Sequence, residues 1–396
     1  MYSGAISKDK VLEVKRIMSS RDKKITSALE RVNKVLLGYK RQCEDKPYNI
    51  METTADLEIQ LMKLRSYMEK YMEHHREFEN RDIVLDFYFE LINYMNVVER
   101  LDECYRIYGR VDEDGEFRVH LMCINPSNNL KMCMEKAVST VFFSATLLPV
   151  NYYKELLSGD KEDYAMYVDS PFEQENRLIF AATDVTSRYT RRNRDEYEKI
   201  ADYIHKVVSS RVGNYMVFFP SYSLLKSVYE VVVERKDFED IMVVCQQSSM
   251  TEKDREDFLA QFETVGDKSL AAFCVMGGIF SEGIDLTNDK LIGTVVVGTG
   301  LPQVCVERDI IMNYFKEMGM NGFDYAYKYP GMNKVLQAAG RVIRTHEDTG
   351  IIALLDERFA SREYGALFPR EWNDLSCVTI KEASIKIDEF VERIYR

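Results

Sequence analysis

The chain has 396 residues, of which 46% are hydrophobic and 30% charged, and its formal net charge is −12. This is the composition of a globular protein with roughly two or three domains. No apolar run reaches the ~18–20 residues that a membrane-spanning helix needs, and the net charge argues against a diffuse polyanion-binding surface. The eight cysteines form no Cys-x-x-Cys pair. We therefore expect reduced thiols in a cytoplasmic protein without a membrane partner.

Residues 1–115 are predicted to form a helical domain. Apolar residues recur at spacings of three and four, as in Val11, Val14 and Met18, and again in Leu57 and Leu61. Charged residues fill the gaps, which is typical of amphipathic helices in an antiparallel bundle. No residue pattern in this part indicates chemistry.

Strands are predicted next, at 117–124 and 140–143, with a short helix between them. Residues 116–150 form a second region on this reading, and residues 151–176 a linker that ends near Ser170-Pro171.

From residue 177 onward, apolar strands alternate with helical patterns. This alternation predicts a doubly wound parallel sheet, in an α/β domain that covers residues 177–396. Ligands of such sheets bind at the carboxyl ends of the strands, where we expect the motifs of this domain to lie. The predicted strands are 178–182, 215–219, 241–245, 270–276, 291–297 and 351–355, and the predicted helices are 195–211, 222–236, 251–264, 303–319 and 332–345.

The most informative stretch is 337–350. On the predicted helix, Gln337, Arg341 and Arg344 share one face, and Gly340 lets another backbone approach closely. Two guanidiniums one turn apart, beside an amide, suit a polyphosphate. From these residues alone, a solvated helix face is the alternative.

Three further stretches end predicted strands and have a local alternative each. Ser221 either caps the next helix or contacts a phosphodiester, with Tyr222 stacking on a base. The segment Gly277–Leu286 is either a plain loop or a ligand loop whose acceptors are Glu282 and Asp285. The hydroxyls of Ser144 and Thr146 either end a strand or relay between a phosphate site and a neighbouring domain.

One concentrated basic run stands apart from these stretches. It contains Arg188, Arg191, Arg192 and Arg194. The run is either a solvated loop or a contact that guides a nucleic-acid strand.

Taken in order, four stretches resemble motifs III, IV, V and VI of superfamily-two helicases. The wording Ser281-Glu282-Gly283-Ile284-Asp285, followed by Gly300-Leu301-Pro302, is similar to the XPD/DinG branch, and residues 322–332 resemble its bacterial DinG-like members. The four stretches are 144–147, 219–222, 278–286 and 337–350.

This resemblance implies an ATP-dependent DNA helicase that moves 5′ to 3′. Residues 177–396 would be the second RecA-like motor domain, 116–150 a remnant of the first, and 1–115 the helical Arch-like domain. The phosphate loop (Gly-Lys-Ser/Thr), the Asp-Glu-Ala-His box and the four-cysteine iron–sulfur pattern of the branch do not occur. We therefore expect a partner that carries the first motor domain, in the same protein or in a separate chain.

Site roles follow from the resemblance. Arg344 would be the arginine finger on ATP, with Arg341 and Gln337 beside it, while the absent half holds most of the Mg²⁺ ligands and no iron–sulfur cluster binds here. The isolated chain is then expected to be inactive. A non-catalytic scaffold and one subunit of a split helicase are the alternatives. Nucleotide contacts would come from Glu282, Gly283, Asp285 and Gly340, and contacts to single-stranded DNA from Ser221, Tyr222, Ser281, Ser144 and Thr146.

Overall fold

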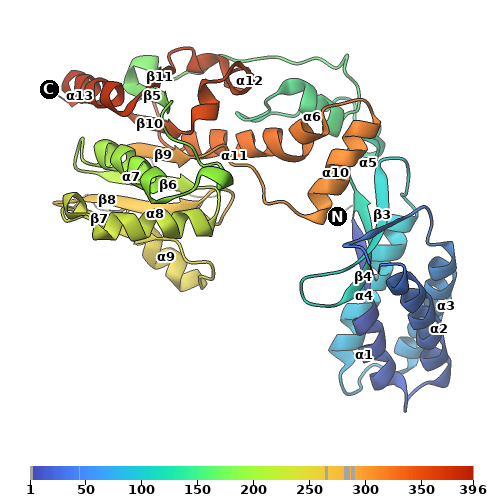
Figure 1. The fold of residues 1–396 in the computed structure, drawn as a ribbon. Coiled ribbons are helices and arrows are strands. Elements are labelled where there is room, and N and C mark those ends of the chain that lie inside the picture. The colour runs from blue at the N-terminus through green and yellow to red at the C-terminus, as the bar shows by residue number, and fades with distance from the viewer. Residues whose placement is uncertain (1–2, 44, 264–265, 281–285, 287–289, 396) are drawn as a thin grey trace. The chain divides into compact units, whose positions relative to one another are not determined.

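The computed structural model describes residues 3–43, 45–263, 266–280, 286 and 290–395, and these form two compact units (Figure 1). Unit 1 consists of residues 1–142, 153–163 and 305–320, and unit 2 of residues 143–152, 164–304 and 321–396. Helix α10 (Val306–Glu317) therefore belongs to unit 1, although unit 2 segments precede and follow it. Helix α6 (Val150–Leu157) lies where the chain passes between the units.

Unit 1 packs helices against one face of an antiparallel sheet with the strand order β1-β4-β3-β2. The hairpin of β3 and β4 is its longest part, with Tyr105 opposite Cys123 and Val111 opposite Phe117. The strands are β1 (Gly4–Ser7), β2 (Asn49–Met51), β3 (Tyr105–Val111) and β4 (Phe117–Cys123). The helices are α1 (Lys8–Met18), α2 (Lys23–Arg41), α3 (Ala55–His74), α4 (Arg81–Val98) and α5 (Ser127–Met134).

The predicted helical pattern of unit 1 is confirmed. Val11, Val14 and Met18 of α1 and Leu57 and Leu61 of α3 are all buried in one core, as their spacing predicted. Helix α1 begins directly after Ser7, because the side chain of this N-cap residue accepts hydrogen bonds from the backbone of the first turn. Strands β1 to β3 were not expected in this unit, because long helical patterns dominate the sequence up to about residue 110.

Unit 2 contains, among its described residues, a seven-stranded sheet in the order β11-β5-β10-β9-β6-β8-β7. Every pairing in it is parallel. The doubly wound parallel sheet predicted from residue 177 onward is thus confirmed. The strands are β5 (Arg177–Ala182), β6 (Asn214–Phe219), β7 (Ile241–Cys245), β8 (Ser269–Val275), β9 (Gly293–Val297), β10 (Gly350–Leu355) and β11 (Ser376–Val378).

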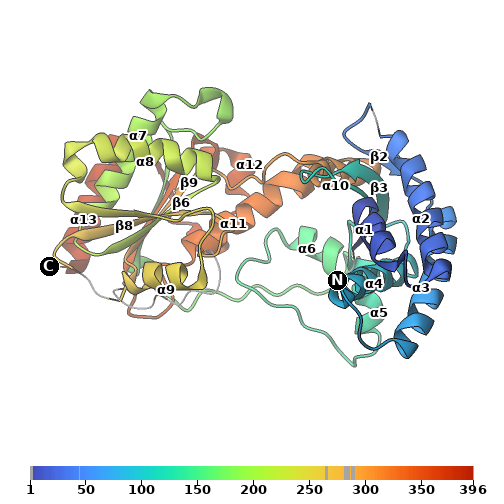
Figure 2. The ribbon, with the colours of Figure 1, turned by 90° about the horizontal axis from the view of Figure 1, so that it is seen from below.

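Helices cover both faces of this sheet, which explains why its strands are apolar runs without alternation. One core joins the sheet to α7, α8 and α13, and a second core joins its other face to α9, α11 and α12. Figure 2 shows α7 and α8 on one face and α9 on the other. Their bounds are α7 (Arg194–Val208), α8 (Tyr222–Glu234), α9 (Glu252–Ala260), α11 (Tyr329–Ala339), α12 (Arg362–Gly365) and α13 (Ile380–Tyr395); a π-helix (Asp324–Lys328) precedes α11, and single 3₁₀ turns occur at Gln174–Asn176, Tyr189–Arg191, Lys236–Phe238, Glu357–Ala360 and Arg370–Trp372.

The strand predicted at 140–143 is wrong for this chain. Residues 138–149 form neither helix nor strand, and Val138, Val141 and Phe143 are 107%, 79% and 90% exposed. A strand persists only when a neighbour takes up its backbone hydrogen bonds. No strand in the described part of the chain pairs with this segment.

Candidate functional site

The first predicted site residues lie where β6 ends. Ser221 is the N-cap of α8, and its hydroxyl accepts a hydrogen bond from the amide of Leu224 at 3.3 Å. Tyr222 is 37% exposed, and its hydroxyl donates to the carbonyl of Gln247 at 3.2 Å. Burial raises the pKa of Tyr222 above its ordinary value, so the phenol stays protonated at neutral pH. The capping role of Ser221 is therefore present, and it leaves the tyrosine ring at the surface.

Gln246, which no sequence motif marks, links Tyr222 to the end of β8, where the next loop begins. Its side chain is buried, donates to the Tyr222 hydroxyl at 2.8 Å and accepts from the amide of Val275 at 2.9 Å. The loop itself begins at Gly277, whose φ of +72° suits glycine. Four predicted residues of this loop, Ser281, Glu282, Gly283 and Asp285, lie outside the described residues.

The predicted helix at 332–345 ends earlier than expected, so the prediction that Gln337, Arg341 and Arg344 share one helix face is wrong. Helix α11 stops at Ala339, with Gly340 as its C-cap. A continued helix would bond the Arg344 amide to the carbonyl of Gly340. Instead, the amides of Arg344 and Thr345 donate to the carboxylate of Asp348, at 2.8 and 2.7 Å.

Residues 340–349, which we name the arginine loop, are held at several points. Asp348 is only 4% exposed. Val342 is buried, and a Cβ on Gly350 would lie 2.4 Å from its Cγ1. The carbonyl of His346 accepts from the side chain of Asn176 at 3.0 Å. The Asp-x-Gly that closes the sequence motif was the available signal, and the structure gives it a role in shaping this loop.

The arginine loop and Ser221 lie at opposite edges of the sheet. The loop leads into the first residue of β10, and Asn176, which contacts it, directly precedes β5. Both are amino ends of parallel strands, whereas Ser221 follows the carboxyl end of β6. The expectation that all motifs lie at the carboxyl ends is therefore wrong for Arg341 and Arg344. The reason is topological, because a helix between two parallel strands must return to the opposite edge.

Helix α11 connects the two edges, and its start is fixed by a glycine pair. A Cβ on Gly331 would lie 2.7 Å from the carbonyl oxygen of Thr299, and one on Gly300 only 2.5 Å from that of Gly331. Gly300 also has a φ of +65°. Only glycine at both positions allows the loop after β9 to contact the first turn of α11 backbone to backbone.

Ser144 and Thr146 lie in an exposed turn of unit 2, not at a strand end. Their hydroxyl oxygens are 3.2 Å apart, and the amide of Thr146 donates to the Ser144 hydroxyl at 3.2 Å. Leu148 packs against the core that includes α11. Among the described residues, the hydrogen bonds of the two hydroxyls stay within this turn and do not reach Ser221 or the arginine loop.

The basic run after β5 also contacts the carboxyl edge. Arg188 and Arg191 both pair with Glu357, at 3.5 and 3.1 Å, and Arg194 pairs with Glu198 and Glu234 on α7 and α8. Beneath the run, Asp356 is fully buried. Burial alone would raise the pKa of the Asp356 carboxyl, but hydrogen bonds and charge from Arg358, with hydrogen bonds from Ser187, outweigh it and hold this pKa below its usual range.

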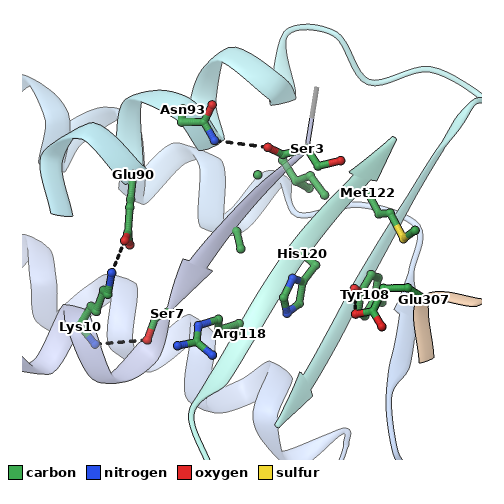
Figure 3. A pocket seen from close by; sticks show the side chains of 13 residues that line it. Ser3, Ser7, Lys10, Glu90, Asn93, Tyr108, Arg118, His120, Met122 and Glu307 are labelled. Atoms are coloured by element: carbon green, nitrogen blue, oxygen red, sulfur yellow. Dashed lines mark hydrogen bonds and ion pairs between the residues drawn. The ribbon is translucent and has the colours of Figure 1, made fainter. Parts of the chain in front are cut away.

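Unit 1 has a pocket of its own, of about 540 Å³, on the sheet face opposite its core (Figure 3). His120 stacks on Tyr108 there with ring centroids 4.8 Å apart. Burial lowers the pKa of His120, against the charge of Asp112. Other charged side chains of the pocket form ion pairs within unit 1. Lys10 pairs with Glu90, and Arg118 pairs with three acidic residues. No sequence motif predicts a site at this pocket.

The described residues contain neither a candidate metal site nor a membrane-spanning helix. They contain no group of three or more His, Cys, Asp or Glu side chains placed to hold a metal ion. No helix within the same residues is long and apolar enough to cross a membrane.

Comparison with known sequences points to one group of proteins. Residues 204–374 match the helicase C-terminal domain family. The chain is 26% identical over 59% of its length to a probable ATP-dependent helicase of Methanocaldococcus jannaschii, and 28% identical over 61% to the ATP-dependent DNA helicase XPD of Sulfolobus acidocaldarius. It is 24% identical over 67% to the 3′-5′ exonuclease DinG of Staphylococcus saprophyticus. These matches cover only 36%, 43% and 29% of the three relatives.

Solved structures give the same answer for the fold. An XPD apo structure superposes with a TM-score of 0.57 at 18% identity, over 95% of this chain and 73% of that one. Xpd4 of S. tokodaii gives a TM-score of 0.56 at 16% identity, over 95% and 72%. Residues 204–374 thus match the helicase C-terminal domain family, and the chain is similar in sequence and in fold to XPD/DinG-like helicases of superfamily two.

Proposed function

We propose that this chain is one half of an ATP-driven motor that moves along single-stranded DNA, with 5′ to 3′ polarity. It supplies the arginine side of the ATP site and part of the DNA-binding surface. The first motor domain, in the same protein or in a separate chain, supplies the phosphate loop, the Mg²⁺ ligands and the residue that activates water. This motor works in the cytoplasm.

The observation that carries the proposal is the arginine loop at the end of α11. In it, Arg344 is held through its own backbone by the buried carboxylate of Asp348. A guanidinium that stabilises a transferring phosphoryl group must be positioned before the reaction. The loop provides that positioning, which a solvated surface arginine lacks.

The apolar segment at 138–143 supports a missing partner. Its side chains have the sequence pattern of a buried strand but are exposed, with Phe143 at 90%. The segment precedes Ser144 and Thr146, in the stretch that resembles motif III. We propose that it pairs with the parallel sheet of the first motor domain, which would also bring both hydroxyls to the cleft. The partial coverage of the relatives agrees with such a missing part.

The roles within the chain follow from charge and position. Arg344 contacts the transferring γ-phosphate of ATP as the arginine finger, Arg341 neutralises the adjacent phosphates, and Gln337 orients the two. Glu282, Gly283, Asp285 and Gly340 line the nucleotide. Ser221 and Ser281 contact DNA phosphates, and Tyr222 stacks on a base. Such contacts go to backbone and base faces and are largely independent of sequence.

A second candidate function is a 3′-5′ exonuclease, which is the name of the staphylococcal relatives. A non-catalytic scaffold would use the same fold for binding alone. Neither candidate explains why Asp348 is buried under the arginine loop.

Titration of a fluorescent oligothymidine with the purified chain tests the proposal. We expect weak, salt-sensitive binding, with a log–log salt slope of about −0.7 for each phosphate contacted. Tyr222→Ala should weaken binding, whereas Lys226→Ala, on the exposed side of the same helix, should not. Absence of binding at low salt would refute the DNA-binding part of the proposal.

A further inference from the structure

One cluster of exposed cations lies outside every stretch that resembles a helicase motif. It consists of the exposed Arg188 and Arg191, the half-buried Arg192 and the exposed ring of Tyr189, in the loop between β5 and α7, and we name it the basic patch. The side chains of Arg188 and Arg191 are 53% and 51% exposed, and Tyr189 is 83% exposed. This concentration of positive charge is notable in a chain whose net charge is −12.

The basic patch is attached to the carboxyl edge of the sheet by the residue that precedes it. The amide and hydroxyl of Ser187 donate to the buried carboxylate of Asp356, at 2.9 and 2.7 Å. Asp356 directly follows β10, so the loop cannot move away from this edge without breaking a buried charged network.

The same residue places the basic patch next to the end of β6. A Cβ on Gly298 would lie 2.4 Å from the Ser187 hydroxyl and 3.6 Å from Pro220. Gly298 follows β9, and Pro220 directly precedes Ser221 and Tyr222. The loops after β5, β9 and β6 therefore adjoin, and the basic patch extends the surface already proposed to bind a nucleic-acid strand.

The chemistry of the basic patch suits that ligand. Arg188 and Arg191 share one partner, Glu357, whose carboxylate receives both hydrogen bonds of Arg191 at 3.1 Å. An exposed pair of this kind contributes little, so a phosphate can replace the carboxylate. The guanidinium of Arg192 lies 5.5 Å from the centre of the Tyr189 ring. Cations beside an exposed aromatic ring bind phosphates and base faces at the same time.

We propose that the basic patch binds single-stranded nucleic acid, with Arg188 and Arg191 on successive phosphates and Tyr189 stacked on a base. Glu357 holds the two guanidiniums together when no strand is bound. This inference rests on the proposed function and adds a DNA contact that none of the helicase-like motifs provides. The alternative is a solvated loop with no ligand.

The test is an anisotropy titration of oligothymidine at several salt concentrations, with the full chain and four variants. Arg188→Gln/Arg191→Gln should weaken binding about tenfold and reduce the salt slope by about 1.4, because each phosphate contact to a single strand contributes about 0.7. Tyr189→Ala should weaken binding about fivefold or more without changing the slope, since stacking releases no counterions. Glu357→Gln should strengthen binding, by up to about fivefold.

Arg194→Gln is the control, because it removes one positive charge from an exposed arginine that pairs with Glu198 and Glu234 instead. It should leave affinity and slope unchanged. Thermal melting of each variant checks folding, which these exposed side chains should not affect. The same titrations with oligouridine distinguish DNA from RNA, and a loss of binding on either polymer supports the basic patch.

Two results would overturn the inference, and they differ in what they leave standing. If the double arginine variant binds with the parent's affinity and slope while Tyr222→Ala loses binding, the basic patch is a solvated loop and the proposed function stands. If the parent chain does not bind at all, the basic patch and the DNA-binding part of the proposed function both fail.

Discussion

At the carboxyl edge of the unit 2 sheet, Arg188 and Arg191 are half exposed and share a surface carboxylate. At the amino edge, the arginine loop is shaped by Asp348, a buried carboxylate that accepts a hydrogen bond from the backbone amide of Arg344. The six residues of β10 separate the two edges, a distance of about 20 Å. The same residue type is thus left adaptable at one edge and held in place at the other.

We propose that this difference corresponds to two kinds of phosphate recognition. A strand that slides requires contacts that form and break readily, which exposed pairs allow. A phosphoryl group that reacts requires a cation whose position is fixed in advance. Helix α11 joins the edges, so substitutions at the amino edge, at the carboxyl edge and at the start of α11 can test this difference.

The largest expected effect concerns the amino edge. We predict that the isolated chain hydrolyses ATP no faster than background, because it carries no phosphate loop. In a protein that also contains the first motor domain, Arg344→Ala should lower kcat by roughly 10³-fold or more. Lys226→Gln, at an exposed position on α8, should leave kcat unchanged. A phosphate-release assay measures both, and robust turnover by the isolated chain that Arg344→Ala abolishes would contradict the prediction.

Next in size is the effect of removing the support of the arginine loop. Asp348→Ala leaves two backbone amides without their acceptor and should lower the free energy of unfolding by about 3 kcal/mol. Hydrogen exchange should also accelerate at Arg344 and Thr345. Asp254→Ala is the matched control, because Asp254 also accepts a backbone hydrogen bond, from Thr251 at 2.8 Å, but at an exposed cap. Its removal should cost only about 1 kcal/mol. Unchanged exchange at Arg344 would show that Asp348 does not shape the loop.

The connection between the edges should respond to a single methyl group. Gly331→Ala would bring a Cβ to 2.7 Å from the Thr299 carbonyl, and we expect a loss of about 2 kcal/mol in urea unfolding. Gly38→Ala is the control, since nothing lies within 4 Å of a Cβ there, in the last turn of α2. That variant should instead gain about 0.5–1 kcal/mol. Equal stability of the two variants would mean that the glycine contact is loose.

The smallest effect is the pH dependence of the carboxyl edge. The folded-state pKa of Asp356 lies below its usual value, so its contribution to stability is complete above the unfolded pKa of about 3.9 and is lost as the pH falls through the folded pKa. Asp356→Asn should therefore lower stability at neutral pH but make it fall less steeply in acid. Asp240→Asn, at a 95% exposed side chain, should keep the parent's slope. Parallel curves for Asp356→Asn and the parent would refute this assignment.

Much of this fold could be predicted because its signals are local. The apolar runs at 178–182 and 215–219 became β5 and β6, since a strand buried on both faces needs no alternation. The capping role of Ser221 was visible from its place between a strand and a helical pattern. By contrast, Gln246 gave no signal, because its two side-chain partners, Tyr222 and Val275, are brought together only by neighbouring strands.

The sequence by itself determined the alternation of strands and helices from residue 177 onward, the parallel sheet and the resemblance to helicases, because periodicity and motif wording are properties of neighbouring residues. Only the tertiary structure decided where α11 ends. Gly340 permits either continuation or a stop, and the close approach of Gly350 to Val342 and to the backbone of Ile292, far away in the sequence, accompanies the stop. The assignment of α10 to unit 1 was likewise decided by the tertiary structure. So was the outcome at 138–143, where the apolar pattern forms no strand because no strand in the described part of the chain pairs with it.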